Sequence, residues 1–522
     1  FLCRPVFGLL ATCCVRGGAA FHLVSSVSFL NNGGVPLQTW RVGLPHVCCA
    51  KTEVTKTERS PLACIEDSCV VFEETPAASV QEAVPILLLC CAIAAICSLD
   101  RVVMSIAILP MGLQFAYSDA TKGVIAAGFS VGYGFGLLPA GVASSTSSPK
   151  WVLLSGLLLW SVAQASSPAA ASIGLPALLF ARAMMGLGEA AAIPSLQSIA
   201  KQFVPADRRS LFWGCLSASL SSGTIAAYTL TPPLIDAQGW PFVFEAYGAA
   251  GAGIALLWAI WGASEPKATT LPASATAVGT QVLKDAPITT SAATIAVTAK
   301  AAEADMWADM PWQAIAASPR VWALTTAHMS SNFFMYFGLS WLPTFFNYQW
   351  GLSTAEASAA SMLPYVAGAF GSLTAGIACD TLVSRANLEL TRARKVMQSI
   401  GCGGPAVAML ALCCLTSGAI PGLTPERSQV ESLFIFAIAC QACSAAGYGC
   451  AAQDISTRLA ALIYGGTSVF AVAFGAMGQF FTGWLLEVNG RDFTPMFALT
   501  AFVELLGLIT FCKWWSSEVE FE

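Results

Sequence analysis

The sequence predicts an all-α membrane protein in which twelve transmembrane helices form two six-helix bundles. Of its 522 residues, 56% are hydrophobic and only 11% are charged, and the mean hydropathy is +0.67. Soluble domains carry about a quarter of their residues as Asp, Glu, Lys and Arg, so a chain this poor in charge needs lipid as the solvent for much of its surface. Apolar runs of spanning length recur from Val84 onward, and one long polar gap divides them into two sets.

The first 83 residues differ in composition from the rest of the chain. Ser, Thr and Val are frequent, basic residues are scattered throughout, and no acidic residue precedes Glu53. This composition is typical of an organelle transit peptide. The apolar run from Phe7 to Val15 also fits the end of a signal peptide that is cleaved before Phe21. A signal peptide followed by a transit peptide resembles the two-part presequences of algae with secondary plastids, so we expect residues 1–83 to be a plastid-targeting or disordered region.

Twelve apolar segments, each about 20 residues long and separated by short polar breaks, follow this region. They are predicted at Ile86–Leu109, Gly123–Ala143, Trp151–Ala171, Pro176–Val204, Leu211–Ile235, Pro241–Gly262, Val321–Phe346, Ala357–Cys379, Val396–Leu415, Leu433–Ala452, Leu459–Leu486 and Met496–Cys512. The first six form an N-terminal bundle, residues 84–264, and the last six form a C-terminal bundle, residues 319–517. Residues 265–318 are predicted to be a central linker loop, and residues 518–522 a short tail.

The basic residues of the loops predict how the chain is oriented in the membrane. If the first span starts on the inner side, nine Lys and Arg residues lie in inner loops and only Lys122, Arg427 and Arg491 lie in outer loops. Cytoplasmic loops carry an excess of Lys and Arg, so both tails are expected on the inner side.

Ionisable residues placed deep in apolar spans are the informative exceptions. Each costs about 2.5–3.5 kcal/mol at mid-bilayer, so such residues normally face the bundle interior and mark a substrate or proton path. Asp100 and Arg101 lie inside the first span, and Arg182 and Glu189 lie seven residues apart on one face of the fourth span. A guanidinium group is always protonated, and its planar fork of donors matches phosphate or carboxylate. Two inward arginines from different spans therefore predict an anion-binding site made by Arg101 and Arg182.

Two further residues are candidates for coupling. A carboxyl group in the same low-dielectric cavity can alternate between protonated and ionised forms, which makes Glu189 the first candidate. His328, inside the seventh span, is the second. A structural interpretation stays open for both, in which Arg182 and Glu189 lock the bundle as partners and His328 is a hydrogen-bonded core residue. Glu504, in the last span, has no visible partner.

Other function classes have little support in the sequence. The net charge is −5 without a long basic tract, so nucleic-acid binding has no electrostatic basis. Many of the 19 cysteines lie inside apolar runs, where Cys behaves as a small hydrophobic residue. Neither metal-ligand spacing nor a Ser–His pairing stands out inside the spans, so we expect no cofactor and no enzymatic activity.

Several motifs resemble one known family. They are residues 98–108, the signature formed by Arg182, Gly186, Gly188, Glu189 and Pro194, and the segments 239–244, 341–344, 380–385, 394–400 and 453–458. Together they resemble the anion transporters of the major facilitator superfamily, the group that includes plant plastid phosphate transporters, sialin and vesicular glutamate transporters.

The resemblance implies a carrier that works by alternating access and holds its substrate between the two bundles. It implies that Arg101 and Arg182 bind inorganic phosphate or a similar small anion, and that Glu189 tunes coupling to a Na+ or H+ gradient. A conformational latch at the inner ends of the helices is expected from Lys150, Asp380, Arg385, Lys395, Asp454 and Arg458. The expected setting is a multi-pass protein of a plastid membrane, either the inner envelope or the thylakoid, that acts as a monomer.

Two departures from the family pattern keep alternatives open. Ser145 replaces an acidic residue in the loop after the second span, and Ser331 stands where relatives often carry His or Arg. One alternative is a carrier of organic anions such as glutamate or ascorbate. The other is a receptor or scaffold that has a carrier fold but transports nothing.

Overall fold

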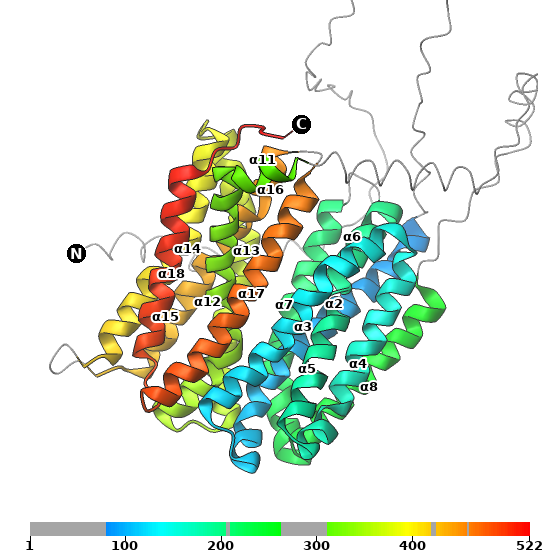
Figure 1. Ribbon diagram of the computed structural model, residues 1–522, viewed down its shortest axis with the longest axis vertical. Coiled ribbons are helices and arrows are strands. Elements are labelled where there is room, and N and C mark those ends of the chain that lie inside the picture. The colour runs from blue at the N-terminus through cyan, green and yellow to red at the C-terminus, as the bar shows by residue number, and fades with distance from the viewer. Residues whose placement is uncertain (1–79, 205–208, 263–310, 419–423, 457–458, 522) are drawn as a thin grey trace, which may run out of the picture. The chain divides into compact units, whose positions relative to one another are not determined.

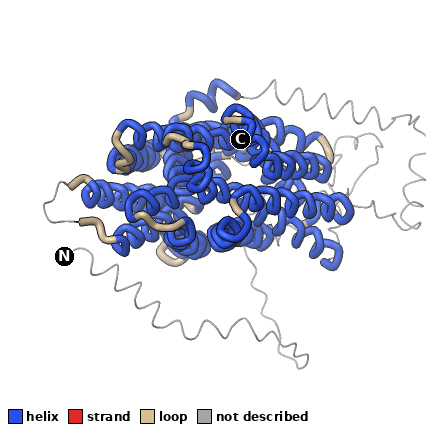
Figure 2. The backbone as a smooth tube through the Cα atoms, turned by 90° about the horizontal axis from the view of Figure 1, so that it is seen from below, coloured by secondary structure: helices blue, strands red, loops and turns tan. Residues whose placement is uncertain are grey.

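The computed structural model describes residues 80–204, 209–262, 311–418, 424–456 and 459–521. The chain divides into two units, Phe1–Phe72 and Glu73–Glu522, and the first lies outside the described residues. Residues 1–79 of the predicted targeting region and residues 263–310, which include most of the predicted linker, also lie outside them. The described residues form helices and connecting loops, with no strand among them (Figure 2).

The N-terminal bundle consists of six helical spans. They are α2 (Val80–Phe115), α3 (Asp119–Thr146), α4 (Pro149–Ile173), α5 (Leu175–Glu189) with α6 (Ala192–Phe203), α7 (Arg209–Gln238) and α8 (Trp240–Trp261). The fourth span is divided between α5 and α6 at Ala190 and Ala191. Pro194 lies in the first turn of α6, where it has no backbone N–H to continue the hydrogen bonding of α5.

The C-terminal bundle also consists of six spans. They are α12 (Pro319–Trp350), α13 (Thr354–Ser384), α14 (Leu390–Thr416), α15 (Arg427–Gln441) with η3 (Ala442–Ala445) and α16 (Tyr448–Ile455), α17 (Ala460–Val488) and α18 (Thr494–Trp514). The tenth span is thus interrupted, as the fourth is. A short helix, α11 (Trp312–Ala317), precedes α12 within the region predicted to be linker.

This arrangement confirms the predicted fold class. Ten helical segments of the described chain are long and apolar enough to cross a membrane. The other two spans, α7 and α12, contain more polar residues, but their 30 and 32 residues are long enough to cross it. The C-terminal tail is packed against the C-terminal bundle, because the backbone N–H groups of Glu520 and Phe521 donate to the Ile455 carbonyl at 2.9 and 3.1 Å.

The two bundles meet along α3 and α17, which lie side by side (Figure 1). Their backbones touch at the end where α3 begins and α17 ends, which is the outer end in the predicted orientation. A Cβ on Gly483 would lie 2.3 Å from the Asp119 carbonyl oxygen, and a Cβ on Gly123 would lie 3.0 Å from the Gln479 carbonyl oxygen. Glycine is therefore required here by the close approach of the helices.

An apolar cluster joins the bundles a second time. Val102, Ile106 and Tyr228 of the N-terminal bundle pack against residues of the C-terminal bundle that include Leu339 and Tyr365. The rings of Tyr228 and Tyr365 stack with their centroids 5.7 Å apart. Helices α2 and α7 are thereby fixed against α12 and α13, beside the pocket described next.

Candidate functional site

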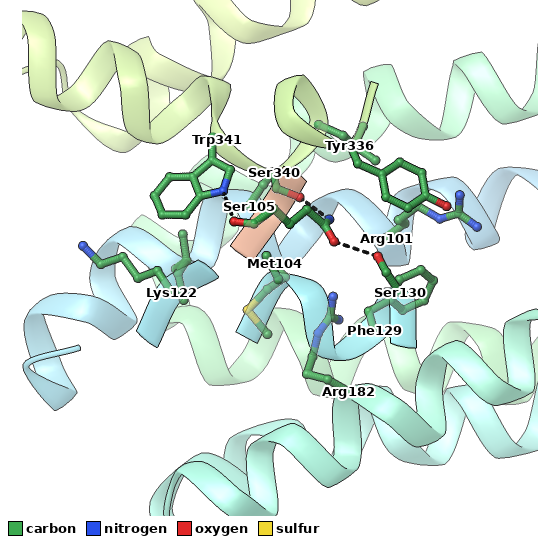
Figure 3. Close-up of a pocket in the computed structure, with 14 residues that line it drawn as sticks. Arg101, Met104, Ser105, Lys122, Phe129, Ser130, Arg182, Tyr336, Ser340 and Trp341 are labelled. Atoms are coloured by element: carbon green, nitrogen blue, oxygen red, sulfur yellow. Dashed lines mark hydrogen bonds between the residues drawn. The ribbon is translucent and has the colours of Figure 1, made fainter. Parts of the chain in front are cut away.

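A pocket lies between the two bundles and holds both predicted substrate-binding arginines (Figure 3). About 540 Å³ of it is free of protein atoms, open solvent included. The N-terminal bundle supplies Arg101, Met104, Ser105, Ile108, Lys122, Ala126, Phe129, Ser130 and Arg182. The C-terminal bundle supplies Tyr336, Leu339, Ser340, Trp341 and Gln479.

Arg101 of α2 forms an ion pair with Glu189 of α5. Arg101 Nε donates to Glu189 Oε1 at 3.0 Å, and Arg101 Nη2 contacts the same oxygen. The guanidinium also lies over the rings of Phe129 and Tyr133, 5.2 and 5.1 Å from their centroids. Glu189 Oε2 is buried without a hydrogen-bond partner. The sequence left open whether Glu189 pairs with Arg182, and the structure pairs it with Arg101.

Arg182 of α5 is consequently a buried cation without a carboxylate partner. Its residue is only 2% exposed, and it forms no ion pair with any residue that the structure describes. Its Nη1 points at Met185 Sδ at 3.1 Å, its Nε has no partner, and its guanidinium carbon lies 5.3 Å from the Phe129 ring centroid. Water is largely withdrawn from this charge, and the carboxyl groups of Asp100 and Glu189 interact with it electrostatically without forming an ion pair, which leaves the Arg182 guanidinium able to receive an anion.

The close packing of α3 against α5 brings these groups together. A Cβ on Gly132 would lie 1.9 Å from the Ala183 carbonyl oxygen, and one on Gly186 would lie 2.0 Å from the Phe129 carbonyl oxygen. Only glycine allows the two backbones to approach this closely. The ring of Phe129 is thereby placed between the two arginines, where it contacts both guanidinium groups through cation–π interactions.

Asp100, the neighbour of Arg101, is a buried acid that was not among the predicted site residues. It is fully buried, and neither of its carboxyl oxygens has a hydrogen-bond partner among the described residues. The signal was present in the sequence, because Asp100 lies in the same apolar span as Arg101. An arginine suggests anion binding directly, whereas an acid becomes informative only once its lack of a partner is known.

The chain matches the family model of the Major Facilitator Superfamily over residues 89–471. The chain belongs to this superfamily. Its family and its relatives are transporters, which confirms the predicted class of a membrane transporter that is not an enzyme.

Three plant proteins show the relationship in detail. Probable anion transporter 1, chloroplastic, of Oryza sativa subsp. japonica is 32% identical over 424 residues, which are 81% of this chain and 75% of that one. Two Arabidopsis thaliana proteins are similar to a comparable degree. Sodium-dependent phosphate transport protein 1, chloroplastic, is 30% identical over 81% of this chain and 77% of its own length. Ascorbate transporter, chloroplastic, is 31% identical over 81% of this chain and 73% of its own length.

A solved structure shows the same fold. A bacterial homolog of the human lysosomal transporter Spinster, described as inward-facing and occupied, superposes with a TM-score of 0.61. The alignment covers 83% of this chain and 96% of that one at 17% sequence identity.

Charged residues close the space between the bundles of this major facilitator protein at the outer end. Asp119 accepts hydrogen bonds from Lys122 Nζ at 2.9 Å, from Arg491 Nε at 3.2 Å and from the Tyr348 hydroxyl. The Arg491 guanidinium also lies 4.6 Å from the centroid of the Tyr348 ring. We call these four residues the outer cluster. Because they come from both bundles, the outer cluster must rearrange if the bundles separate at this end.

Close backbone contact between the bundles does not extend to the inner end. A Cβ on Gly141 of α3, or on Gly465 or Gly466 of α17, would meet no atom within 4 Å. The described structure is therefore tightly joined at the outer end, where glycines of α3 and α17 touch.

The residues of the predicted latch are distributed over this inner end. Arg394 forms a two-point ion pair with Asp454, at 2.8 Å from Nε and 3.1 Å from Nη2, and also donates to the Ala446 carbonyl at 2.8 Å. The sequence selected Asp454 but not Arg394 for the latch. Asp380 and Arg385 are exposed at the end of α13.

Three further latch candidates remain. Lys150 is buried at the start of α4, with its Nζ 5.8 Å from the Trp151 ring centroid. Lys395 is half-buried, and neither lysine forms an ion pair with a described residue. Arg458 lies outside the described residues, so the latch as a whole stays a prediction.

His328 lies inside the C-terminal bundle and does not line the pocket. Its ring is stacked between those of Tyr448 and Tyr464, with centroid distances of 4.7 and 5.2 Å, and its Nδ1 is 3.1 Å from Thr467 Oγ1. These contacts are those of a hydrogen-bonded core residue. Its predicted role in coupling would require a path from this stack to the pocket.

Proposed function

We propose that this chain is a secondary active carrier that moves inorganic phosphate or a similar small anion across a plastid membrane by alternating access. The observation that carries the proposal is the Arg182 guanidinium, which is buried at the pocket without a carboxylate partner. A buried charge is stable only when it is paired, and a substrate anion would supply the missing partner. The relatives named as chloroplastic anion and phosphate transporters support both the cargo and the membrane.

The ion pair of Arg101 with Glu189 supports a division of roles within the pocket. Arg101 is the only pocket arginine with part of its side chain exposed, at 23%, so it can be reached by an incoming anion. An anion that binds to Arg101 would compete with Glu189 for the guanidinium. A Glu189 carboxylate released in this way would need a cation, and this exchange would couple anion binding to cation binding.

We infer H+ or Na+ as that cation from the carboxyl oxygens near the pocket that have no partner. Both oxygens of Asp100 and the Oε2 of Glu189 are buried, and none of them has a hydrogen-bond donor in the part of the chain that the structure describes. Such oxygens can hold a proton or contribute to a Na+ site, and either would neutralise charge next to the arginines. Imposing each gradient separately on the same liposomes would tell the two ions apart.

A second candidate cargo is an organic carboxylate. A carboxylate matches the arginine fork as well as phosphate does, and one of the relatives is named as an ascorbate transporter. Both cargoes require the same arginines. The two cargoes can therefore be told apart only by measuring which anion is transported.

The experiment is uptake of labelled phosphate and labelled ascorbate by proteoliposomes under an imposed ion gradient. Arg182→Ala is expected to lower uptake of the transported anion at least about 30-fold, because truncating one side of a buried charged contact costs about 2–5 kcal/mol. Arg182→Lys is expected to keep only part of the activity, since an ammonium group lacks the planar fork.

Arg427→Ala is the matched control. Arg427 lies at the start of α15, where its side chain is 42% exposed and paired with Glu431. This variant is expected to transport as the wild type does. Wild-type rates in a folded Arg182→Ala protein would refute the proposal. Absence of uptake for every anion tested, with the protein folded, would favour the receptor or scaffold alternative.

A further inference from the structure

The two walls of the pocket differ in charge. All the charged side chains that line it come from the N-terminal bundle, on α2, α3 and α5. The C-terminal bundle offers only neutral groups, among which Gln479 carries a side-chain amide, and Ser340 and Tyr336 carry hydroxyl groups. Ser340 and Tyr336 are labelled in Figure 3. Ser331, where relatives often carry a cation, is buried beside Ser444 and does not line the pocket. A substrate that bridges the two bundles therefore meets arginines on one side and neutral polar groups on the other.

Gln479 is held firmly at the centre of the neutral wall. Its Oε1 accepts from the Ser130 hydroxyl at 2.7 Å, and its Nε2 donates to Ser340 Oγ at 2.6 Å. Its backbone carbonyl accepts from Trp341 Nε1 at 3.1 Å. Gln479, on α17, thus joins α3 of the N-terminal bundle to α12 of the C-terminal bundle. The residue is only 6% exposed. A buried amide fixed in this way has one orientation to present to a ligand.

After these hydrogen bonds, Gln479 and Ser340 still have donors and acceptors that a ligand could use. An amide has two N–H groups and a carbonyl oxygen with two lone pairs, and one of each is still free in Gln479. The Ser340 oxygen accepts from Gln479, and its own O–H has no acceptor among the described residues. The neutral wall can therefore donate to an oxyanion and also accept from a hydroxyl group. An arginine side chain has no hydrogen-bond acceptor, so the arginines of the pocket cannot accept a hydrogen bond from a substrate hydroxyl group.

We propose that Gln479, supported by Ser340, is the part of the C-terminal bundle that contacts the substrate, and that it selects oxyanions that keep a hydroxyl group. Hydrogen phosphate and hydroxy acids belong to this class, whereas sulfate and simple carboxylates do not. Sites that hydrogen-bond a substrate hydroxyl discriminate against analogues that lack it, because a buried polar group is then left unpaired. The inference rests on the proposed function, which it deepens by naming the class of anion.

The experiment compares matched anions in proteoliposomes that contain the full chain. Uptake of labelled phosphate is measured with unlabelled sulfate as competitor, and uptake of lactate is compared with that of propionate. The wild type is expected to prefer the hydroxyl-bearing member of each pair. Gln479→Leu is expected to lower that preference up to about tenfold, the loss of roughly one hydrogen bond to the substrate hydroxyl, while uptake of the weaker substrate falls by a smaller factor.

Arg427→Ala, whose side chain is 42% exposed and lies outside the pocket, is the matched control and is expected to keep the wild-type preference. Ser130→Ala removes one of the two side-chain hydrogen bonds that orient Gln479, and it is expected to lower the preference less than Gln479→Leu does. Ser340→Ala removes only a hydroxyl group and is expected to lower the preference a few-fold. It serves as the second test if Gln479→Leu does not fold.

Each outcome decides between the two proposals. Unchanged preference in Gln479→Leu or Ser340→Ala, with transport intact, would overturn this inference and leave the carrier function standing. A wild type that takes up sulfate as well as phosphate, and propionate as well as lactate, would also overturn it. Loss of all anion uptake in the wild type would contradict the proposed function instead.

Discussion

The N-terminal bundle presents two buried or half-buried arginines to the pocket, whereas Glu504 and His328, which are buried in the C-terminal bundle, do not line it. Arg101 and Arg182 line the pocket, and Glu189 is paired with Arg101 at its wall. Glu504 of α18 is equally buried, yet neither of its carboxyl oxygens has a hydrogen-bond partner among the described residues, and it does not line the pocket. His328 is enclosed by two tyrosine rings.

The difference shows that burial of an ionisable group does not by itself identify its purpose. Charged groups in both bundles are costly in a membrane. In the N-terminal bundle part of this cost falls on Arg101 and Arg182, which line the pocket, whereas Asp100 is as fully enclosed as Glu504. In the C-terminal bundle the same cost falls on groups enclosed by protein, and the wall that meets the pocket is neutral. Three substitutions test this comparison.

Glu189→Gln should have the largest effect. It leaves Arg101 without its ionised partner and removes the carboxyl group proposed to take up the coupling ion. We expect gradient-driven accumulation of the transported anion to fall at least about 100-fold, because a buried charge loses its counter-charge. Exchange of internal for external anion, which needs no net coupling, should be reduced much less. The two assays are run on the same proteoliposomes, and accumulation at the wild-type level would contradict a coupling role for Glu189.

Asp119→Asn should have an intermediate effect at the outer end, where both bundles contribute charge. Lys122 and Arg491 would lose the carboxylate they share, and contact between the bundles should weaken. We expect a cysteine introduced at Ser130 to react about tenfold faster with a membrane-impermeant thiol reagent added from the outer side, which corresponds to about 1.4 kcal/mol. Asp236→Asn, on α7 and without an ion pair among the described residues, is the control. Equal labelling in both variants would show that the outer cluster does not hold this end closed.

Glu504→Gln should have the smallest effect and is the counterpart of Glu189→Gln. The amide has nearly the same shape as the carboxyl group, and the site contributes no ion pair to lose. Uptake should stay within about twofold of the wild type, and the melting temperature should be unchanged or slightly higher, because a partnerless carboxyl group contributes little stability. Uptake and thermal unfolding in detergent measure the two quantities. A large loss of coupled uptake would mean that the C-terminal bundle also carries a coupling group, and the contrast between the bundles would fail.

The sequence predicted much of the fold because membrane helices are dictated by local composition. Each span is a run of apolar residues, and the lipid allows little other than helices there. The two interrupted spans were harder to foresee, since the break in the tenth span follows no proline and depends on packing. A Cβ on Gly447, the N-cap of α16, would lie 2.3 Å from Gln398 Oε1 of α14.

The pairing of the pocket charges could not be read from spacing. Arg182 and Glu189 share a face of the fourth span, but seven residues correspond to about 10 Å along a helix, too far for a direct contact. Glu189 instead pairs with Arg101, which comes from another helix 88 positions away. Gln479 was not among the predicted site residues, because the prediction rested on ionisable residues inside apolar spans and Gln479 is neutral. Its position in the pocket and its hydrogen bonds are visible only in the tertiary structure.

By itself, the sequence determined that this protein lies in a membrane, that its helices form two halves, and that two arginines occur where charge is expensive. Composition and periodicity are local properties, so each of these conclusions follows from the residues of the individual segments without knowledge of how the helices pack. Only the tertiary structure decided which arginine has a carboxylate partner, that charge lines one wall of the pocket and neutral polar groups the other, and that the bundles are joined at the outer end. These are relations between helices distant in sequence, and the packing of glycine-lined faces fixes them.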